Sequence, residues 1–302
     1  NGDGDHVLTD IVRGGGKDLH ANTTDAEATE GEGLYFDNDG FTLGYNHGNY
    51  NRDGRTYVAW NWDMGGSNAS LTAGSINSTV RANPSYGQSI VSYTGNGTAS
   101  ATVAHGLSAK PEMIIIKNRT SSSKNWYVYH EGLHASSPED YRVELNTTNA
   151  ASSNTTGNSL QGTAPTSSLF TLGNGSWVNE NNSAIIAYCF HSVTGYSKFS
   201  SYTGNGSTTG PTVTTGFKPA FVMIKSTAAE KWYMYDNTRN PVNPVNKVLQ
   251  AHVADAEFVT GNKLDFNSAN FQVLNNGATI NTNGQTYIYM AFADKREYAY
   301  WL

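Results

Sequence analysis

The chain repeats itself, and this internal repetition limits its possible folds more than any other feature. The phrase Ser-Tyr-Thr-Gly-Asn-Gly occurs at 92–97 and again at 201–206. Two further segments recur in the same order, residues 110–117 at 218–225 and residues 126–129 at 232–235. The spacing between the copies shortens slightly along the chain, which indicates short loop deletions between conserved strands.

A third, partial copy lies at the front of the chain. Its matches to the last copy are 10–13 with 236–239, 25–27 with 255–257, and 56–58 with 286–288. This first copy lacks the Ser-Tyr-Thr-Gly-Asn-Gly and Lys-Pro segments. We therefore expect either that the chain is the tail end of a longer one or that another chain supplies those strands. The expected organisation is an incomplete β-repeat over 1–66, a linker over 67–87, and β-sandwich repeats over 88–195 and 196–302.

Each repeat is expected to consist of strands. Short runs rich in β-branched and aromatic residues, such as 114–116 and 286–289, alternate with Asn-Gly and Asp-Gly pairs that favour tight hairpin turns. The one helix candidate is Val245–Glu257, and two nearby prolines weaken it. The sequence predicts an all-β protein of tandem antiparallel sandwich or jelly-roll domains.

Composition excludes several classes of protein. Charged residues make up 15% of the chain, aromatic residues 12%, and the formal net charge is −6. This is neither a disordered chain nor a coiled coil. The negative net charge argues against nucleic-acid binding, which normally uses a basic face. No apolar run is long enough for a transmembrane helix, so we expect no membrane insertion. Cys189 is the single cysteine, and its apolar strand predicts a buried small hydrophobe.

No residue pattern establishes catalysis. Asp25 and Glu27 recur as Asp255 and Glu257, but the middle repeat has Asn149 and Ala151 there, so we interpret them as solvated acidic side chains. Cys189 and His191 share one strand face without an orienting third group. We therefore expect a protein that is not an enzyme.

Metal ligands are also sparse. His130 and His134 lie four apart, but a strand followed by Gly132 does not align them as a helix would, and zinc is not expected. Asn1–Asp5 and Asp37–Gly40 look like calcium loops. The first departs from the EF-hand pattern and the second is more simply a hairpin turn, which leaves surface calcium as a hypothesis. We expect no cofactor and no resident metal.

Aromatic and amide side chains on a β-sandwich suit carbohydrate recognition, because rings stack on sugars and amides bond their hydroxyls. The candidates are Trp60, Trp62, Trp126, Trp177 and Trp232. Trp126 and Trp232 are equivalent in the repeats, which favours a core role. Trp177 has no equivalent and lies beside Asn174 and Asn179, so these three form the predicted ligand-binding site.

Several phrases carry a family resemblance. They are 92–97, 105–107 with 110–118, 126–130, 39–44, 56–62 and the segment 74–84. Together they resemble the repeated β-domains of tail-associated virion proteins from marine bacteriophages such as cyanophages. That family has no assigned enzymatic activity, and its domains often adjoin concanavalin-like or laminin-G-like jelly rolls.

The resemblance implies a particle component located in the virion. We expect a tail fibre or fibre-associated adhesin whose β-sandwich modules attach to a host-surface glycan. The alternative is a capsid or tail decoration protein with only protein–protein contacts, and a polysaccharide depolymerase ranks third. The expected partners are other virion proteins and further copies of the chain. A trimer would let the incomplete first repeat find its missing strands.

Overall fold

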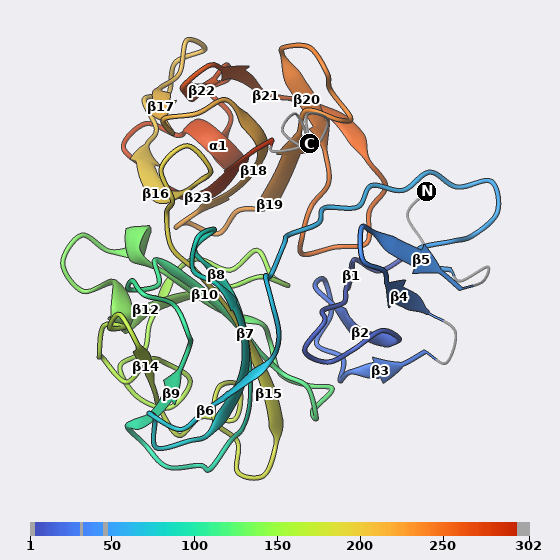
Figure 1. Ribbon diagram of the computed structural model, residues 1–302. Helices are drawn as coiled ribbons and strands as arrows, with labels where there is room; N and C mark the ends of the chain where they lie inside the picture. The colour runs from blue at the N-terminus through green and yellow to red at the C-terminus, as the bar shows by residue number, and fades with distance from the viewer. Residues whose placement is uncertain (1–3, 31–32, 45–47, 295–302) are drawn as a thin grey trace.

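Three lobes, one for each repeat, surround a common centre (Figure 1). The computed structural model describes residues 4–30, 33–44 and 48–294, and nearly all of its regular structure is antiparallel β-strand. The predicted all-β sandwich fold is confirmed.

The first repeat contains a three-stranded sheet of order β1-β2-β3 and a separate hairpin of β4 and β5. Its strands are β1 (Val7–Leu8), β2 (Lys17–His20), β3 (Ala28–Thr29), β4 (Leu34–Phe36) and β5 (Phe41–Leu43). Residues 48–64 then cross to the third repeat, where Trp60 and Trp62 pack edge-on against Phe221.

The second repeat is built on an eight-stranded sheet of order β13-β12-β11-β10-β15-β8-β7-β6, faced by the β9–β14 ladder. Its elements are β6 (Ala69–Leu71), β7 (Ser78–Asn83), β8 (Gln88–Thr94), β9 (Ala101–Ala104), β10 (Met113–Asn118), β11 (Tyr127–His130), η1 (Glu131–Leu133), η2 (Pro138–Asp140), β12 (Tyr141–Glu144), β13 (Ser152–Ser153), β14 (Leu169–Leu172) and β15 (Ala184–Phe190).

The third repeat is a sandwich of two four-stranded sheets, of order β16-β23-β18-β19 and β17-β22-β21-β20. Its elements are β16 (Ser197–Thr203), β17 (Thr212–Thr214), β18 (Pro219–Ser226), β19 (Trp232–Asp236), β20 (Val245–Val248), β21 (Phe258–Asn267), β22 (Asn270–Val273), α1 (Ala278–Asn281) and β23 (Thr286–Ala293).

The structure corrects two expectations about local structure. Residues 67–87 are not a loose linker, because β6 and β7 extend the large sheet of the second repeat and Val80 is buried. Ser70 on the edge strand β6 and Thr79 on β7 are exposed, which is compatible with a sheet that has one solvent-facing side. Ser78 on β7 is buried instead, and its hydroxyl donates to Ala104 O at 2.9 Å. Val245–Glu257 is not a helix. Its first four residues form β20, in agreement with the β-branched valines at both ends of that strand.

The central strand of each sandwich is buried on both faces, which explains its continuous apolar sequence. In β10, Met113 and Ile115 face the centre of the molecule, whereas Ile114 and Ile116 face the interior of the second sandwich. Strand β18 repeats this division in the third sandwich. A period-two strand can therefore serve two cores at once.

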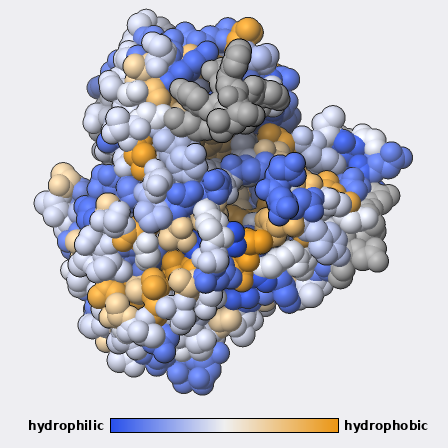
Figure 2. Space-filling view, viewed as in Figure 1, coloured by the Kyte–Doolittle hydropathy of each residue, from blue (hydrophilic) through white to orange (hydrophobic). Residues whose placement is uncertain are grey.

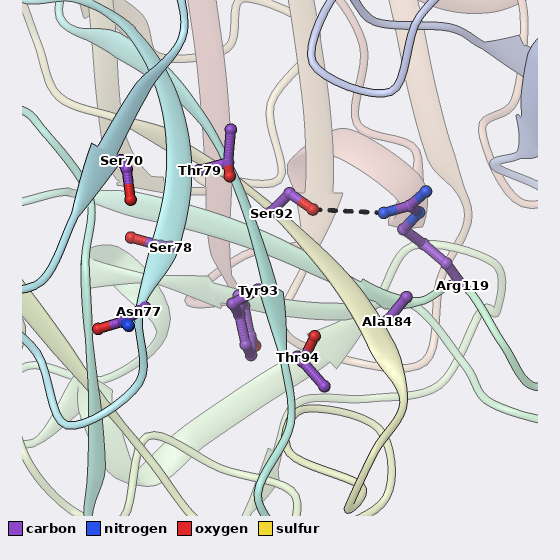
Figure 3. Close-up of a pocket in the computed structure, with 9 residues that line it drawn as sticks. All are labelled: Ser70, Asn77, Ser78, Thr79, Ser92, Tyr93, Thr94, Arg119 and Ala184. Carbon is purple, nitrogen blue, oxygen red and sulfur yellow. Dashed lines mark hydrogen bonds between the residues drawn. The ribbon is translucent and has the colours of Figure 1, made fainter.

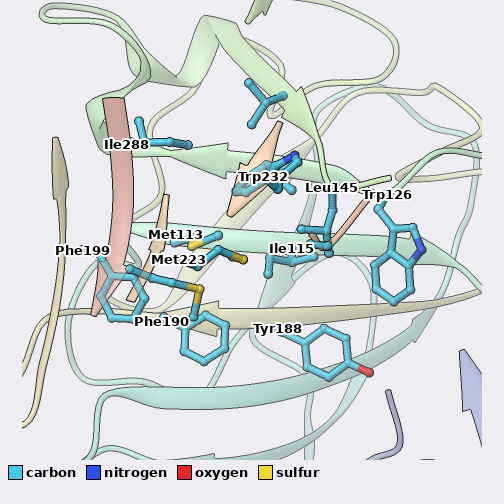
Figure 4. Close-up of a cluster of buried hydrophobic side chains, with 14 of the residues drawn as sticks. Met113, Ile115, Trp126, Leu145, Tyr188, Phe190, Phe199, Met223, Trp232 and Ile288 are labelled. Carbon is cyan, nitrogen blue, oxygen red and sulfur yellow. The ribbon is translucent and has the colours of Figure 1, made fainter. Parts of the chain in front are cut away.

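All three repeats contribute to the core at the centre of the molecule. Figure 4 labels side chains that the second and third repeats supply to it. Leu19 comes from the first repeat, Met113 and Trp126 from the second, and Met223 and Trp232 from the third. Trp126 and Trp232 are 0% and 1% exposed, so their predicted core role is confirmed. The repeats are thus joined by a common hydrophobic core.

A ring nitrogen at one repeat position links each repeat to a neighbour. Strand pairing establishes the equivalence, since Val7 lies opposite His20 as Tyr127 lies opposite Glu144. The donor nitrogens and their carbonyl acceptors are Trp126 Nε1 with His20 O (3.0 Å), Trp232 Nε1 with Glu144 O (2.9 Å), and His6 Nε2 with Gln250 O (3.0 Å). These contacts run from the second repeat to the first, from the third to the second, and from the first to the third.

A second set of contacts involves Asp10, His130 and Asp236, which lie at one repeat position, and it runs around the molecule in the opposite direction. The pairs are Tyr188 Oη with Asp10 Oδ2 (2.7 Å), His130 Nε2 with Tyr289 O (3.1 Å), and Trp60 Nε1 with Asp236 Oδ2 (3.3 Å). They join the first repeat to the second, the second to the third, and the third to the first. The repeats therefore form a closed ring of three, with related contacts at every junction.

Candidate functional site

A shallow polar pocket lies on the second repeat, beside its junction with the first (Figure 3). Its volume is about 270 Å³. The lining residues are Ser70, Asn77, Ser78, Thr79, Ser92, Tyr93, Thr94, Arg119 and Ala184. In Figure 2 the surface of the second repeat is a mixture of hydrophilic and hydrophobic residues, whereas the lining of this pocket consists mainly of hydroxyl, amide and guanidinium side chains. Such a hollow suits a small polar group rather than a large apolar ligand.

Strand register produces a row of hydroxyl groups in this pocket. Ser70 on β6 pairs with Thr79 on β7, and Thr79 pairs with Ser92 on β8. Directly paired residues share a sheet face, so these three side chains lie on one surface at the spacing of adjacent strands, about 4.8 Å. A hydroxyl can both donate and accept, and this row can therefore bond to a hydroxyl-rich ligand.

Arg119 stands at the end of this row and is held there by the first repeat. Its Nε and Nη2 donate to the two carboxylate oxygens of Glu27 at 2.7 and 2.9 Å, and its Nη1 donates to Ser92 Oγ at 3.3 Å. The backbone N–H of Glu27 donates in turn to Arg119 O at 2.8 Å. The bidentate pair fixes the plane of the guanidinium.

Glu27 stays ionised because cations surround it. Burial alone would raise the pKa of Glu27, but its hydrogen bond with Arg119 and the charges of Arg119 and Arg13 lower that pKa below the ordinary value. Arg13 also pairs with Asp10, so two carboxylates balance two guanidinium groups. The expectation that Glu27 is a solvated acid is wrong, whereas Asp25 is exposed.

The third repeat keeps the pairing of one arginine with two carboxylates. The second repeat lacks the glutamate and keeps only the backbone hydrogen bond of the junction. Arg239 pairs with Asp236 at 2.6 Å and with Glu257 at 3.2 Å, as Arg13 pairs with Asp10 and Glu27. In the second repeat Ala151 takes the place of Glu27, and its N–H still donates to Thr227 O at 2.8 Å. Thr227 is the counterpart of Arg119. The backbone junction is thus repeated, but Arg119 is not.

The predicted site at Asn174, Trp177 and Asn179 is not a free ligand platform. Asn174 is exposed and Trp177 is half-buried. The Arg142 guanidinium lies 5.0 Å from the centre of the Trp177 ring and stacks on it, so one ring face is covered. The sequence could not show this contact, because Arg142 is far from Trp177 along the chain.

Asn179 is fully buried and has a structural role. Its Oδ1 accepts from Asn96 N at 2.9 Å and its Nδ2 donates to Thr98 O at 2.8 Å. Asn281 bonds to the Asn205 loop in the same way in the third repeat. Asn179 therefore holds the repeated Ser-Tyr-Thr-Gly-Asn-Gly turn and does not face a ligand.

Other sequence candidates have structural surroundings. His130 is buried at a junction, whereas His134 is exposed and stacks on Tyr141. Cys189 is fully buried, as predicted, and burial raises the pKa of its thiol well above the usual range. Asp37–Gly40 forms the turn between β4 and β5, and part of the Asn1–Asp5 candidate lies outside the described residues.

Within residues 4–30, 33–44 and 48–294, no cluster of three or more His, Cys, Asp or Glu side chains could hold a metal ion. In that same part of the chain, no helix is both long and apolar enough to cross a membrane.

Sequence reasoning missed the Arg119 pocket. Two signals pointed to it: an arginine opposite Thr227 in the aligned repeats, and alternation of Val and Ala with Ser, Thr and Arg over 78–83, which is typical of a strand. The Ser/Asn/Gly content of 67–87 hid the second signal, because such composition usually marks loops.

The fold and this site define a three-repeat β-sandwich protein with a polar pocket beside one repeat junction. Residues 1–296 match the family model described as "Domain of unknown function (DUF7483)", and the chain belongs to that family. No curated protein and no solved structure matches the chain.

Proposed function

We propose that the protein is a structural and adhesive component of a bacteriophage particle, a tail fibre or fibre-associated adhesin, and that the Arg119 pocket contacts a host-surface glycan. The observation that carries the binding role is the row of Ser70, Thr79 and Ser92 beside a fixed guanidinium. The virion role rests on the sequence resemblance to tail-associated proteins.

The chemistry of the pocket favours sugars over apolar ligands. Hydroxyl side chains match the alternating donors and acceptors of a sugar ring. Arg119 keeps N–H donors beyond those that bond to Glu27 and Ser92, and these can donate to a sugar hydroxyl. Because Glu27 already fixes the guanidinium, little side-chain entropy is lost when a ligand binds.

The test compares adsorption to host cells for the purified chain and two variants. Thr79→Val removes an exposed hydroxyl from the middle of the row, and Thr212→Val makes the same change on the exposed face of β17 as a matched control. We expect Thr79→Val to reduce both cell binding and blocking of infection, and Thr212→Val to leave both unchanged. Equal behaviour of the two variants would refute the pocket assignment.

A decoration protein with only protein–protein contacts is the second candidate, and the exposed Tyr35, Phe36 and Tyr57 of the first repeat favour it. In that case the chain would bind purified particles but not host cells. A depolymerase would release reducing sugar from host capsule, and we expect no such release. We also propose that the chain forms a homo-oligomer, a trimer in a fibre, which light scattering would detect as a multiple of the chain mass.

A further inference from the structure

The first repeat exposes apolar residues whose counterparts in the third repeat are buried. Phe36 is 37% exposed and Tyr57 is 46% exposed, whereas Phe266 and Tyr287 at the equivalent positions are 3% and 0% exposed. We call the set Leu34, Phe36, Phe41, Leu43 and Tyr57 the open face. Figure 2 shows hydrophobic residues at the surface of the lobe in which Figure 1 places β4 and β5.

Strand register establishes the equivalence. In β4 and β5, Leu34 pairs with Leu43 and Phe36 pairs with Phe41. The β21–β22 pairs at the same positions are Leu264 with Val273 and Phe266 with Phe271, all four of which are buried in the third core. The β4–β5 hairpin is therefore one wall of the same sandwich, without the opposite wall.

In the third repeat, residues 196–226 supply that opposite wall. Tyr202 on β16 lies against Phe271 and Tyr287, with ring centres 6.0 and 5.1 Å apart. Val222 and Ile224 on β18 fill the same core. Strand β17 also pairs with the edge of β22, so this segment provides both backbone partners and apolar side chains.

Within its described residues, the first repeat has free backbone edges at the positions where β16, β17 and β18 pair in the third repeat. Residues 56–63 correspond to β23, which pairs with β16 on one side and β18 on the other. In the described part of the chain, residues 56–63 form no strand, and β5 pairs only with β4. Such edges bind an added strand through backbone hydrogen bonds.

We propose that the open face is a docking site for a three-strand polypeptide segment with the pattern of residues 196–226, supplied from outside these 302 residues. Within the chain, the two segments of this pattern are already occupied, since β8 pairs with β7 and β15, and β18 pairs with β19 and β23. A second copy of the chain would have to dismantle its own buried sheet to act as donor.

The experiment adds a synthetic peptide of residues 196–226 to the full chain and follows amide hydrogen exchange. Bound peptide is expected to slow exchange in residues 33–44 and 56–63 and to reduce binding of an apolar dye. In a control peptide, Tyr202, Val222 and Ile224 are changed to Ser, which keeps the backbone but removes the apolar contacts. This control is expected neither to slow exchange nor to reduce dye binding.

Variants of the chain complete the test. Tyr57→Ser and Phe36→Ser are each expected to weaken peptide binding about tenfold, because burial of a large apolar side chain drives such association. Val259→Ser changes a residue that is 68% exposed in the third repeat and is the matched control. Unchanged exchange at 56–63 with saturating peptide would overturn the proposal. A chain dimer abolished by Tyr57→Ser would also overturn it, because the occupant would then be a second copy.

Discussion

His130 is held in one neutral form at the junction between the second and third repeats. The Gly132 N–H donates to its Nδ1 at 2.9 Å, so the ring proton lies on Nε2 and is donated to Tyr289 O at 3.1 Å. Burial lowers the pKa of His130 to about 4, although the Tyr289 carbonyl works in the opposite direction. Protonation of Nδ1 would therefore break its hydrogen bond with the Gly132 N–H.

This arrangement predicts a loss of stability on acidification. An unfolded histidine has a pKa of about 6.5, so below that pH the unfolded chain takes up a proton that the folded chain refuses until about pH 4. Stability therefore falls as the pH falls through this window. At pH 5 the unfolded pKa lies about 1.5 units above the pH, and at about 1.4 kcal/mol per unit the contribution of His130 is roughly 2 kcal/mol.

Urea unfolding at pH 7 and pH 5 measures this effect. His130→Gln does not titrate and keeps an amide that can donate to Tyr289 O. The unaltered protein is expected to lose about 2 kcal/mol more free energy of unfolding than this variant between the two pH values. His134→Gln makes the same change at an exposed position and controls for the substitution itself. An equal loss in the unaltered protein and in His130→Gln would refute the reasoning.

Three further substitutions test other contacts. Trp232→Phe removes the indole donor to Glu144 O and leaves a small void, so urea unfolding should show a loss of about 1–2 kcal/mol, and no loss would contradict the ring contact. Glu27→Gln should lower the free energy of unfolding, measured with urea, by about 2 kcal/mol at pH 7. Because the pKa of Glu27 is lowered, its contribution is present above about pH 4.5 and disappears as the pH falls, so the variant and the unaltered protein should converge in acid. Gly95→Ala places a Cβ against the carbonyl oxygen of Glu180, and thermal unfolding should show a loss of about 1–3 kcal/mol, whereas an unchanged midpoint would mean that the turn can relax.

The repeats and the strand class could be predicted because they depend on local sequence. The aligned Trp126 and Trp232, the hairpin turn at Asp37–Gly40, and the apolar strand around Cys189 all have the surroundings that their sequence indicates. A buried strand needs apolar and β-branched residues wherever it lies in the fold. Such a strand can therefore be recognised from its own sequence, without knowledge of the partner strand.

The candidate site could not be predicted, because it depends on contacts between repeats. Glu27 looked like a solvated acid until the second repeat placed Arg119 against it. Trp177 looked like a free ring until Arg142 covered it. In both cases the partner is distant along the chain, and a charged residue at a junction has the same sequence signature as one on a free surface.

The ring of repeats has a consequence for how such a chain can evolve. In an open solenoid each end can gain or lose a unit, because a unit contacts only its immediate neighbours. In a closed ring every repeat presents one face to each of the other two, so a duplicated or deleted unit would leave two faces unmatched. Lineages of this chain are therefore expected to diversify through insertions between or within repeats, while the number of repeats stays fixed. Strands β6 and β7, which lie between the first two repeats in the sequence, illustrate such an insertion.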